Sequence, residues 1–111
     1  MPVFEKNIVT HKGWFDDTLP EFVKDYNEKI SFLHIDCDLY SSTKTIFKWL
    51  DNQITEGTII LFDEYFNYPF WEQHEYKAFQ EFVNQNNISY EYLCYSSKTF
   101  GSKVAVKILK R

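Results

Sequence analysis

Two pairs of acidic residues are the groups in this sequence that could do chemistry. Asp36 and Asp38 follow one apolar run, in the string HIDCDLYSST. Asp63 and Glu64 follow a second apolar run, in the string EGTIILFDEY. Carboxylates held close together raise one another's pKa unless a cation compensates their charge, and Mg²⁺ prefers such oxygen ligands. The pattern favours a metal or catalytic site over the alternative, in which the acids cap helices or lie solvated in loops.

A strand, a helix and a second strand must position these acids. The sequence predicts strands over Ile30–Asp36 and Thr58–Phe62, and a helix over residues 42–54 from the spacing of its apolar residues. A crossover helix makes the two strands parallel, and neighbouring parallel strands lie roughly 4.8 Å apart. Asp36 and Asp63 should therefore lie side by side at the carboxyl edge of the sheet, where open α/β sheets bind ligands.

The segment before this unit predicts a short strand and a short helix. The strand is expected over Val3–Val9 and the helix over Leu19–Tyr26, with Thr18 as its N-cap and Pro20 in its first turn. Between them, Trp14 and Phe15 could pack against a planar ligand or fasten a loop onto the core. Periodicity alone favours the core.

The segment after this unit predicts a loop, a helix and two strands. Tyr65–Phe70 is expected to be a loop because Pro69 disfavours helix before it, and a helix is expected over Trp71–Asn86. Ser89–Tyr95 and Lys103–Leu109 are predicted as antiparallel strands because their connection is short.

Two histidines have open interpretations. His34 lies inside the first predicted strand, which reads as apolar on both faces, so a hydrogen-bonded core histidine is favoured over a ligand. His74 stands at the start of the predicted helix, near the strand ends, and either helps to bind substrate or lies on the surface.

The composition narrows the class of protein. A chain of 111 residues with 20% aromatic residues predicts one small domain with its own core. A net charge of −4 argues against nucleic acid as the main partner, and no apolar run approaches the roughly 20 residues of a membrane span. Cys37 and Cys94 lack CxxC spacing and no signal peptide is evident, so they are predicted to be reduced thiols in a cytoplasmic protein.

From about Lys12 onward the sequence resembles the macrocin O-methyltransferase family. The resemblance lies in KGWFDDTLP, in HIDCDLYSST with the following FDEY, and in the closing pair of strands. It implies a class I methyltransferase fold, S-adenosylmethionine as methyl donor, a divalent metal such as Mg²⁺, and a hydroxyl of a sugar or natural-product-like small molecule as acceptor.

The resemblance also implies roles for individual residues. Asp36, Asp63 and Glu64 match metal ligands, although the family often has a second aspartate where this chain has Glu64. Asp38 matches the general base. Trp14 and Phe15 match the edge of the adenosine pocket, and His74 and Tyr65 are the candidate substrate-binding residues.

Residues 1–111 are expected to form a single α/β domain that corresponds to the C-terminal part of this fold. Its three glycines are isolated, so the glycine-rich turn that holds the cofactor in a Rossmann-like fold is missing. The strand Ile30–Asp36 should then lie at an exposed sheet edge. This edge invites pairing with another chain, either a missing N-terminal half or a second copy, or with the N-terminal segment of this chain.

Other functions remain open at this stage. The chain could be a non-catalytic remnant or interaction module that keeps the sheet without the cofactor site. A metal-dependent glycosyltransferase or a phosphatase also carries a strand followed by DxD, but Leu39 and Tyr40 fit the phosphatase pattern poorly.

Overall fold

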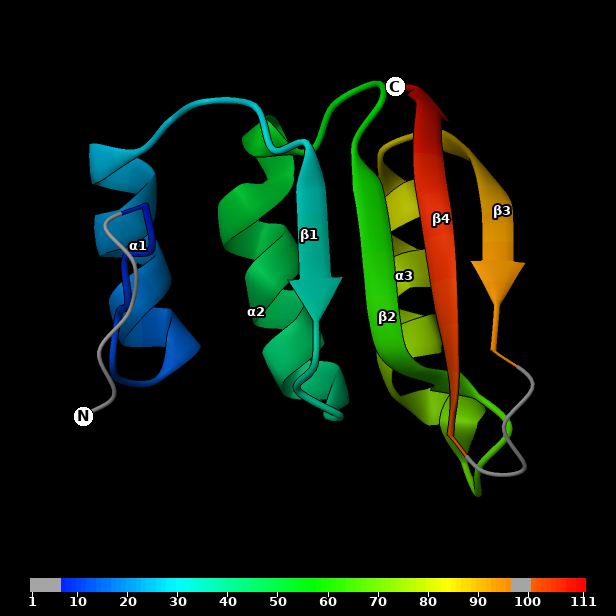
Figure 1. Ribbon diagram of the computed structural model, residues 1–111. Coiled ribbons are helices and arrows are strands. Elements are labelled where there is room, and N and C mark those ends of the chain that lie inside the picture. Colours follow the sequence, from blue (N-terminus) through cyan, green and yellow to red (C-terminus); the bar gives the residue numbers. More distant parts are fainter. Residues whose placement is uncertain (1–6, 97–100) are drawn as a thin grey trace.

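The computed structural model describes residues 7–96 and 101–111, and it shows a four-stranded sheet with helices packed on one face (Figure 1). The strand order is β1-β2-β4-β3. β1 and β2 are parallel, while β4 pairs antiparallel with both β2 and β3. The strands are β1 (Phe32–Ile35), β2 (Ile59–Phe66), β3 (Ser89–Tyr95) and β4 (Ser102–Lys110). The prediction of an α/β, partial Rossmann-like sheet with a C-terminal antiparallel pair is confirmed.

In the described part of the chain three α-helices accompany the sheet, and two of them cover it. The helices are α1 (Phe15–Asp25), α2 (Tyr40–Leu50) and α3 (Glu75–Gln85), and 3₁₀ turns lie at Asp51–Gln53 and Trp71–Gln73. The predicted helix over residues 42–54 is thus α2 with the 3₁₀ turn that follows it. Figure 1 shows α2 and α3 behind the sheet and α1 beside α2.

Aromatic side chains form the centre of the core between the helices and the sheet. Phe47 of α2 stacks on Phe82 of α3, with ring centroids 4.5 Å apart and planes 8° from parallel. Phe62 of β2 packs edge-on against Phe79 of α3 at 5.0 Å. Such pairs add to the free energy gained by burying the rings. The core therefore fixes α2 and α3 against β2, the strand that carries Asp63 and Glu64.

The start of α1 differs from the prediction. The N-cap is Trp14, whose backbone is extended, and the acids Asp16 and Asp17 stand in the first turn, where the helix dipole favours them. Thr18 is not a cap. Its hydroxyl donates to the carbonyl oxygen of Trp14 at 3.1 Å, the bond to the preceding turn that a threonine inside a helix can make. Of the predicted strand Val3–Val9, residues 3–6 lie outside the described residues, and residues 7–9 form no strand.

β2 runs four residues further than predicted. Phe62 pairs with Val104 but Phe66 pairs with Ser102, so four steps along β2 match only two along β4. Asp63 and Glu64 lie inside this irregular part of the strand, and the first two residues of the predicted loop Tyr65–Phe70 are strand as well. The irregularity bends the strand and changes the direction in which its side chains point.

The predicted helix over Trp71–Asn86 is broken. A 3₁₀ turn comes first, then His74 with φ −118° and ψ −125°, and only then α3. α3 nevertheless buries the predicted stripe of Ala78, Phe79, Phe82 and Val83.

β1 lies at the edge of the sheet, as expected, with β2 as its one neighbour among the described strands. Ile35 is buried under the helices, whereas Phe32 on the opposite face is 58% exposed. The prediction that this strand is covered on both faces is wrong, because α2 and α3 pack on the same face (Figure 1). His34 shares the open face with Phe32 and is exposed, so the prediction of a core histidine is wrong too.

Two smaller findings concern the class of protein. Cys37 and Cys94 are both free thiols. In the part of the chain that the structure describes, no helix combines the length and the apolar character that crossing a membrane requires.

Candidate functional site

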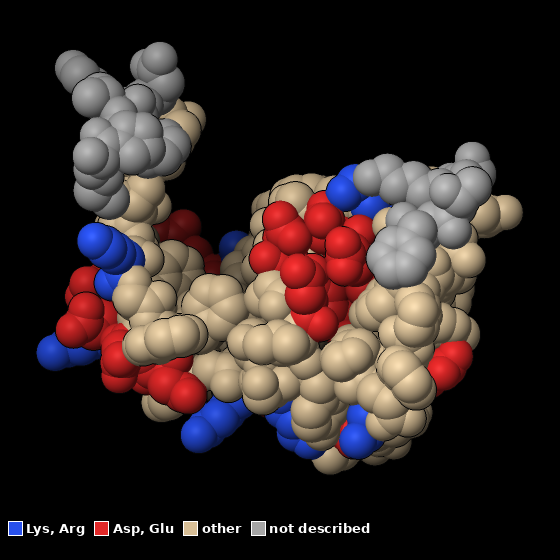
Figure 2. Space-filling model, turned by 90° about the horizontal axis from the view of Figure 1, so that it is seen from below, with Lys and Arg blue, Asp and Glu red and all other residues tan. Residues whose placement is uncertain are grey.

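The two acidic pairs meet at one end of the sheet. Ile35 at the end of β1 pairs with Phe62 of β2, so the residues that follow each of them lie side by side. The carboxyl group of Asp36 interacts with that of Asp63, and the carboxyl group of Asp38 interacts with that of Glu64. Figure 2 looks onto this end of the molecule and shows acidic side chains gathered in one patch. The structure therefore brings together all four predicted acids.

The charges of this cluster are compensated on one side only. The Lys103 ammonium donates to the Asp63 carboxylate, and His34 Nε2 lies 3.4 Å from the same oxygen. The hydrogen bond from Lys103 is the main reason that the pKa of Asp63 is lowered. The pKa of Glu64 is raised instead, first by burial and then by the charges of its acidic neighbours.

The donor atoms suit a hard cation, but their arrangement does not. In residues 7–96 and 101–111 no group of three or more His, Cys, Asp or Glu side chains is placed to hold a metal ion. Asp63 already has Lys103 as its cationic partner. The residues as they stand do not fit a divalent metal, and the role of Asp36, Asp63 and Glu64 as metal ligands stays a prediction.

Asp38, the predicted general base, has an unusual backbone. Its φ is +61°, in the left-handed region that costs a residue with a Cβ on the order of 1 kcal/mol or more. A tight turn closes around it, because the Leu39 amide donates to the Cys37 carbonyl oxygen at 2.6 Å. The turn holds the residue just beyond β1, beside the other acids.

Glu75 is a site residue that the sequence reasoning missed. Its side chain is fully buried, and its carboxylate accepts from the amide of Asp38 at 3.2 Å and from the amide of Glu64 at 3.3 Å. Burial raises the pKa of Glu75 to about 7, although these amide bonds act in the opposite direction. A signal was present: Glu75 stands three and four residues before Ala78 and Phe79, on the buried stripe of α3.

Trp14 and Phe15 lie at the start of α1 and face the start of α2. They line a hollow of about 420 Å³ whose other wall includes Leu39, next to Asp38 in the chain, together with Ser41, Ser42 and Thr45. The Trp14 side chain is 83% exposed. The interpretation that it fastens the loop onto the core is therefore wrong.

Tyr65 lies on the helix side of the sheet. It is buried, its hydroxyl lies 2.9 Å from that of Tyr92, and it accepts from Gln80 Nε2 at 3.2 Å. It lines an aromatic hollow of about 520 Å³ together with Phe66, Trp71, Tyr76, Tyr92, Leu93, Cys94, Tyr95 and Val104.

His74 does not line this hollow. Its ring stacks on Tyr68 with centroids 6.0 Å apart, and its buried Nδ1 has no hydrogen-bond partner among the residues that the structure describes. The Tyr68 hydroxyl in turn donates to the carbonyl oxygen of Glu64 at 3.4 Å. The structure thus places the two predicted substrate-binding residues in different surroundings.

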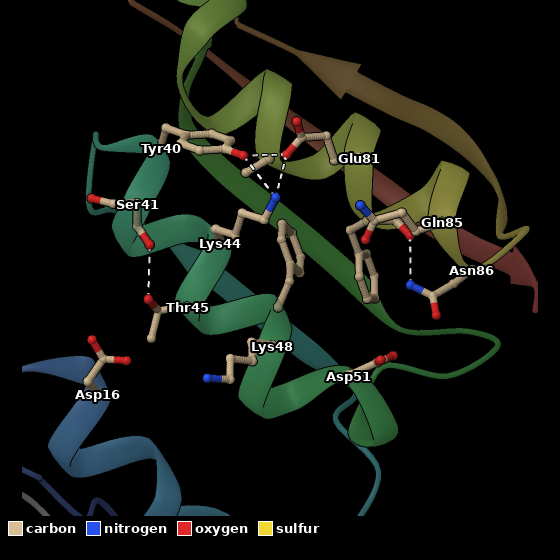
Figure 3. Close-up of a pocket in the computed structure, with 13 residues that line it drawn as sticks. Asp16, Tyr40, Ser41, Lys44, Thr45, Lys48, Asp51, Glu81, Gln85 and Asn86 are labelled. Atoms are coloured by element: carbon tan, nitrogen blue, oxygen red, sulfur yellow. Dashed lines mark hydrogen bonds and ion pairs between the residues drawn. The ribbon is translucent and has the colours of Figure 1, made fainter.

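A larger hollow, of about 590 Å³, lies between α2 and α3 with Asp16 of α1 at its side (Figure 3). The Tyr40 hydroxyl and the Lys44 ammonium both donate to the Glu81 carboxylate, at 2.5 and 2.9 Å, and thereby join the two helices. None of the predicted site residues lines it. Of its two lysines, Lys44 is paired with Glu81, and Lys48 Nζ lies over the Trp49 ring, 5.2 Å from the centroid.

Solved methyltransferases share this fold. The apo structure of CalS11, a TDP-rhamnose 3′-O-methyltransferase of calicheamicin biosynthesis, matches 87% of this chain with a TM-score of 0.66 and 21% identity. The O-methyltransferase NovP matches 89% of this chain with a TM-score of 0.63 and 24% identity. These matches span 40% and 36% of the CalS11 and NovP chains, so the chain covers well under half of their length.

Sequence comparison identifies the family. No curated protein matches the chain. A family model described as macrocin O-methyltransferase matches residues 3–93. This match includes both acidic pairs, the exposed Trp14 and the helix that carries Glu75. Because it extends over most of the sequence, the chain belongs to the macrocin O-methyltransferase family.

Proposed function

We propose that this chain is the part of an S-adenosylmethionine-dependent O-methyltransferase that carries the acidic residues of the active site. The proposed methyl acceptor is a sugar hydroxyl. The observation that carries the proposal is the meeting of Asp36 and Asp38 with Asp63 and Glu64 at the carboxyl end of two parallel strands. That edge is where open α/β sheets bind ligands. The sugar acceptor is inferred from family membership and from the activity that the CalS11 title states.

Asp38 is the proposed general base. A hydroxyl oxygen becomes a better nucleophile as its proton is removed, and a carboxylate within hydrogen-bond reach can accept that proton. The tight turn and the positive φ hold Asp38 in one place beyond β1, which favours one orientation of the acceptor. When bound, the cofactor supplies the methyl group.

Trp14 and Phe15 are the proposed contacts to the cofactor. An exposed indole beside a hollow offers a flat apolar face to a planar ring such as adenine, and Leu39 in the opposite wall is next to Asp38 in the chain. The rest of the cofactor site would come from an N-terminal half of the fold, on this or another chain, or from a second copy of this chain.

The aromatic hollow around Tyr65 is the proposed contact surface of the acceptor. Sugar and aromatic rings pack well against tyrosine and tryptophan faces, and the hydroxyls of Tyr65 and Tyr92 can exchange hydrogen bonds with polar groups. His74, which does not line this hollow, is proposed to help bind the acceptor through its contact with Tyr68.

The free thiols of Cys37 and Cys94 suit a reducing compartment, so we propose a cytoplasmic location.

Binding of the predicted Mg²⁺ would require the acidic cluster to rearrange, and no step is assigned to the ion. A divalent ion at the acidic cluster would have to compete with Lys103 for Asp63.

The second candidate function is a non-catalytic interaction module of the same fold. The ion pair between Lys103 and Asp63 favours it, because the lysine compensates the charge of Asp63 without any metal.

Calorimetric titration with S-adenosylhomocysteine, with and without Mg²⁺, tests the proposal. Where a second copy completes the site, we expect micromolar binding. Trp14→Ala should weaken this binding at least tenfold, whereas Trp49→Phe, a change at a tryptophan outside this hollow, should leave it unchanged. If Mg²⁺ strengthens binding in the wild type and has no effect in Asp36→Asn, the result would support a metal site at Asp36. No binding at millimolar ligand would mean that this chain alone is not a methyltransferase and would favour the interaction module.

A further inference from the structure

Glu75 occupies a position that requires an explanation, because a buried carboxylate is costly unless it is hydrogen-bonded. Among the described residues, Glu75 is the one charged side chain in the buried set, and its exposure is 0%. It opens α3, where the positive end of the helix dipole favours a negative charge. Its neighbours on the same stripe are apolar, so burial in the core alone would favour an apolar residue here.

The two oxygens of Glu75 have different partners, one from each acidic strand end. Oε2 accepts from the amide of Asp38, three residues beyond β1. Oε1 accepts from the amide of Glu64, inside the irregular part of β2. One side chain from α3 therefore connects the two segments that carry the acidic cluster.

Both amides need such a partner for reasons that lie in the backbone. β1 ends at Ile35 and the chain turns with a positive φ at Asp38, so the sheet ladder offers that amide no acceptor. The register of β2 shifts between Phe62 and Phe66, and Glu64 lies within the shift. Both hydrogen bonds to Glu75 are partly buried, and a backbone amide that is removed from water without an acceptor is costly.

We propose that Glu75 is a positioning residue, which holds the turn at Asp38 and fixes the distance between Asp38 and Glu64 by bridging their backbone amides. A carboxylate is required because both partners are donors. A glutamine offers one acceptor oxygen, and its amide nitrogen is itself a donor. An aspartate is one methylene shorter and cannot span the same two amides from the same backbone position.

The inference rests on the proposed function only for the importance of Asp38 and Glu64. Its geometry can be tested without activity, by amide hydrogen exchange followed by NMR. In the wild-type chain both amides should exchange at least about tenfold more slowly than exposed loop amides. In Glu75→Gln one or both should exchange about tenfold faster, as expected when an amide loses its hydrogen-bond acceptor.

Two control variants separate positioning from general stability. Glu81→Gln makes the same chemical change two turns later on α3 and removes a surface contact, so it should leave both amides unchanged. Phe82→Leu lowers overall stability through the core and should speed exchange throughout the chain without singling out Asp38 and Glu64.

Two results would overturn the proposal. One is fast exchange of the Asp38 and Glu64 amides in the wild type, a measurement that does not depend on whether any variant folds. The other is a folded Glu75→Gln variant in which both amides keep their wild-type protection. If the wild-type chain does not bind S-adenosylhomocysteine, the result counts against the proposed function and leaves this inference standing.

Discussion

The burial of Glu75 should make the stability of the protein depend on pH. Its pKa is about 7 in the folded protein and near the ordinary 4.5 when unfolded. Between these values the folded state holds a proton that the unfolded state has lost, so the free energy of unfolding falls as the pH rises from about 4.5 to about 7. The fall should amount to at most about 3 kcal/mol.

Urea unfolding of the wild type and of Glu75→Gln at several pH values measures this dependence. The difference between the two proteins should shrink or change sign across the window, because glutamine does not titrate. Asp63, whose pKa is lowered, contributes in the opposite direction at lower pH in both proteins and therefore cancels in the difference. Parallel curves for the two proteins from pH 4.5 to 7 would contradict the raised pKa of Glu75.

At the scale of single residues the acids of the candidate site could be identified from the sequence, but the contacts that fix their positions could not. Asp36 and Asp63 were predictable neighbours, because two parallel strands that end level place their next residues side by side. The positive φ of Asp38 and the bridging role of Glu75 depend on contacts between residues 37 positions apart in the chain. Local patterns do not specify such contacts, although the stripe of α3 did place Glu75 on the buried face.

At the scale of elements, existence and type were predictable and boundaries were less so. α2 and α3 follow from apolar residues at helical spacing, which is a property of the local sequence. The extension of β2 to Phe66 was not predictable, because it depends on how β4 pairs with it across the register shift. The early start of α1 was hidden because Trp14, which has no capping side chain, precedes it where Thr18 looked the better cap.

The contact between α2 and α3 gives an element-scale prediction. Phe47 is 4% exposed and stacks on Phe82, so Phe47→Ala should lower the free energy of unfolding by about 3–5 kcal/mol through lost burial and the cavity that remains. Lys44→Met removes the exposed ion pair with Glu81 that joins the same two helices (Figure 3). Urea unfolding should show a far smaller effect for this variant, because exposed pairs are screened by solvent. Equal losses would mean that the surface contact stabilises the protein as much as the core contact does.

At the scale of the whole molecule, the sheet is covered on one face and open on the other. The helices on the covered face bury Ile35 and Phe62, while Phe32 at the free edge of β1 remains exposed. An edge strand offers unpaired backbone groups to any further strand. The solved methyltransferases that share this fold are more than twice as long as the part that this chain matches. A chain with this edge and this open face is expected to pair with more protein, either the remainder of such a fold or a second copy of itself.

The variant Phe32→Lys tests whether the open edge of β1 pairs with a second copy of this chain. Wild-type protein should self-associate at high concentration in light scattering, and Phe32→Lys should weaken the association about tenfold or more, because it removes a large apolar side chain and adds a charge to the edge. Val9→Lys is the matched control, since it places the same charge on an exposed apolar position before α1, away from the sheet. If both variants weaken association equally, net charge is responsible and the edge is not. A wild-type chain that stays monomeric at millimolar concentration would show that the open edge of β1 is not a self-pairing surface, and binding of a separately produced N-terminal half would then be the remaining way to cover it.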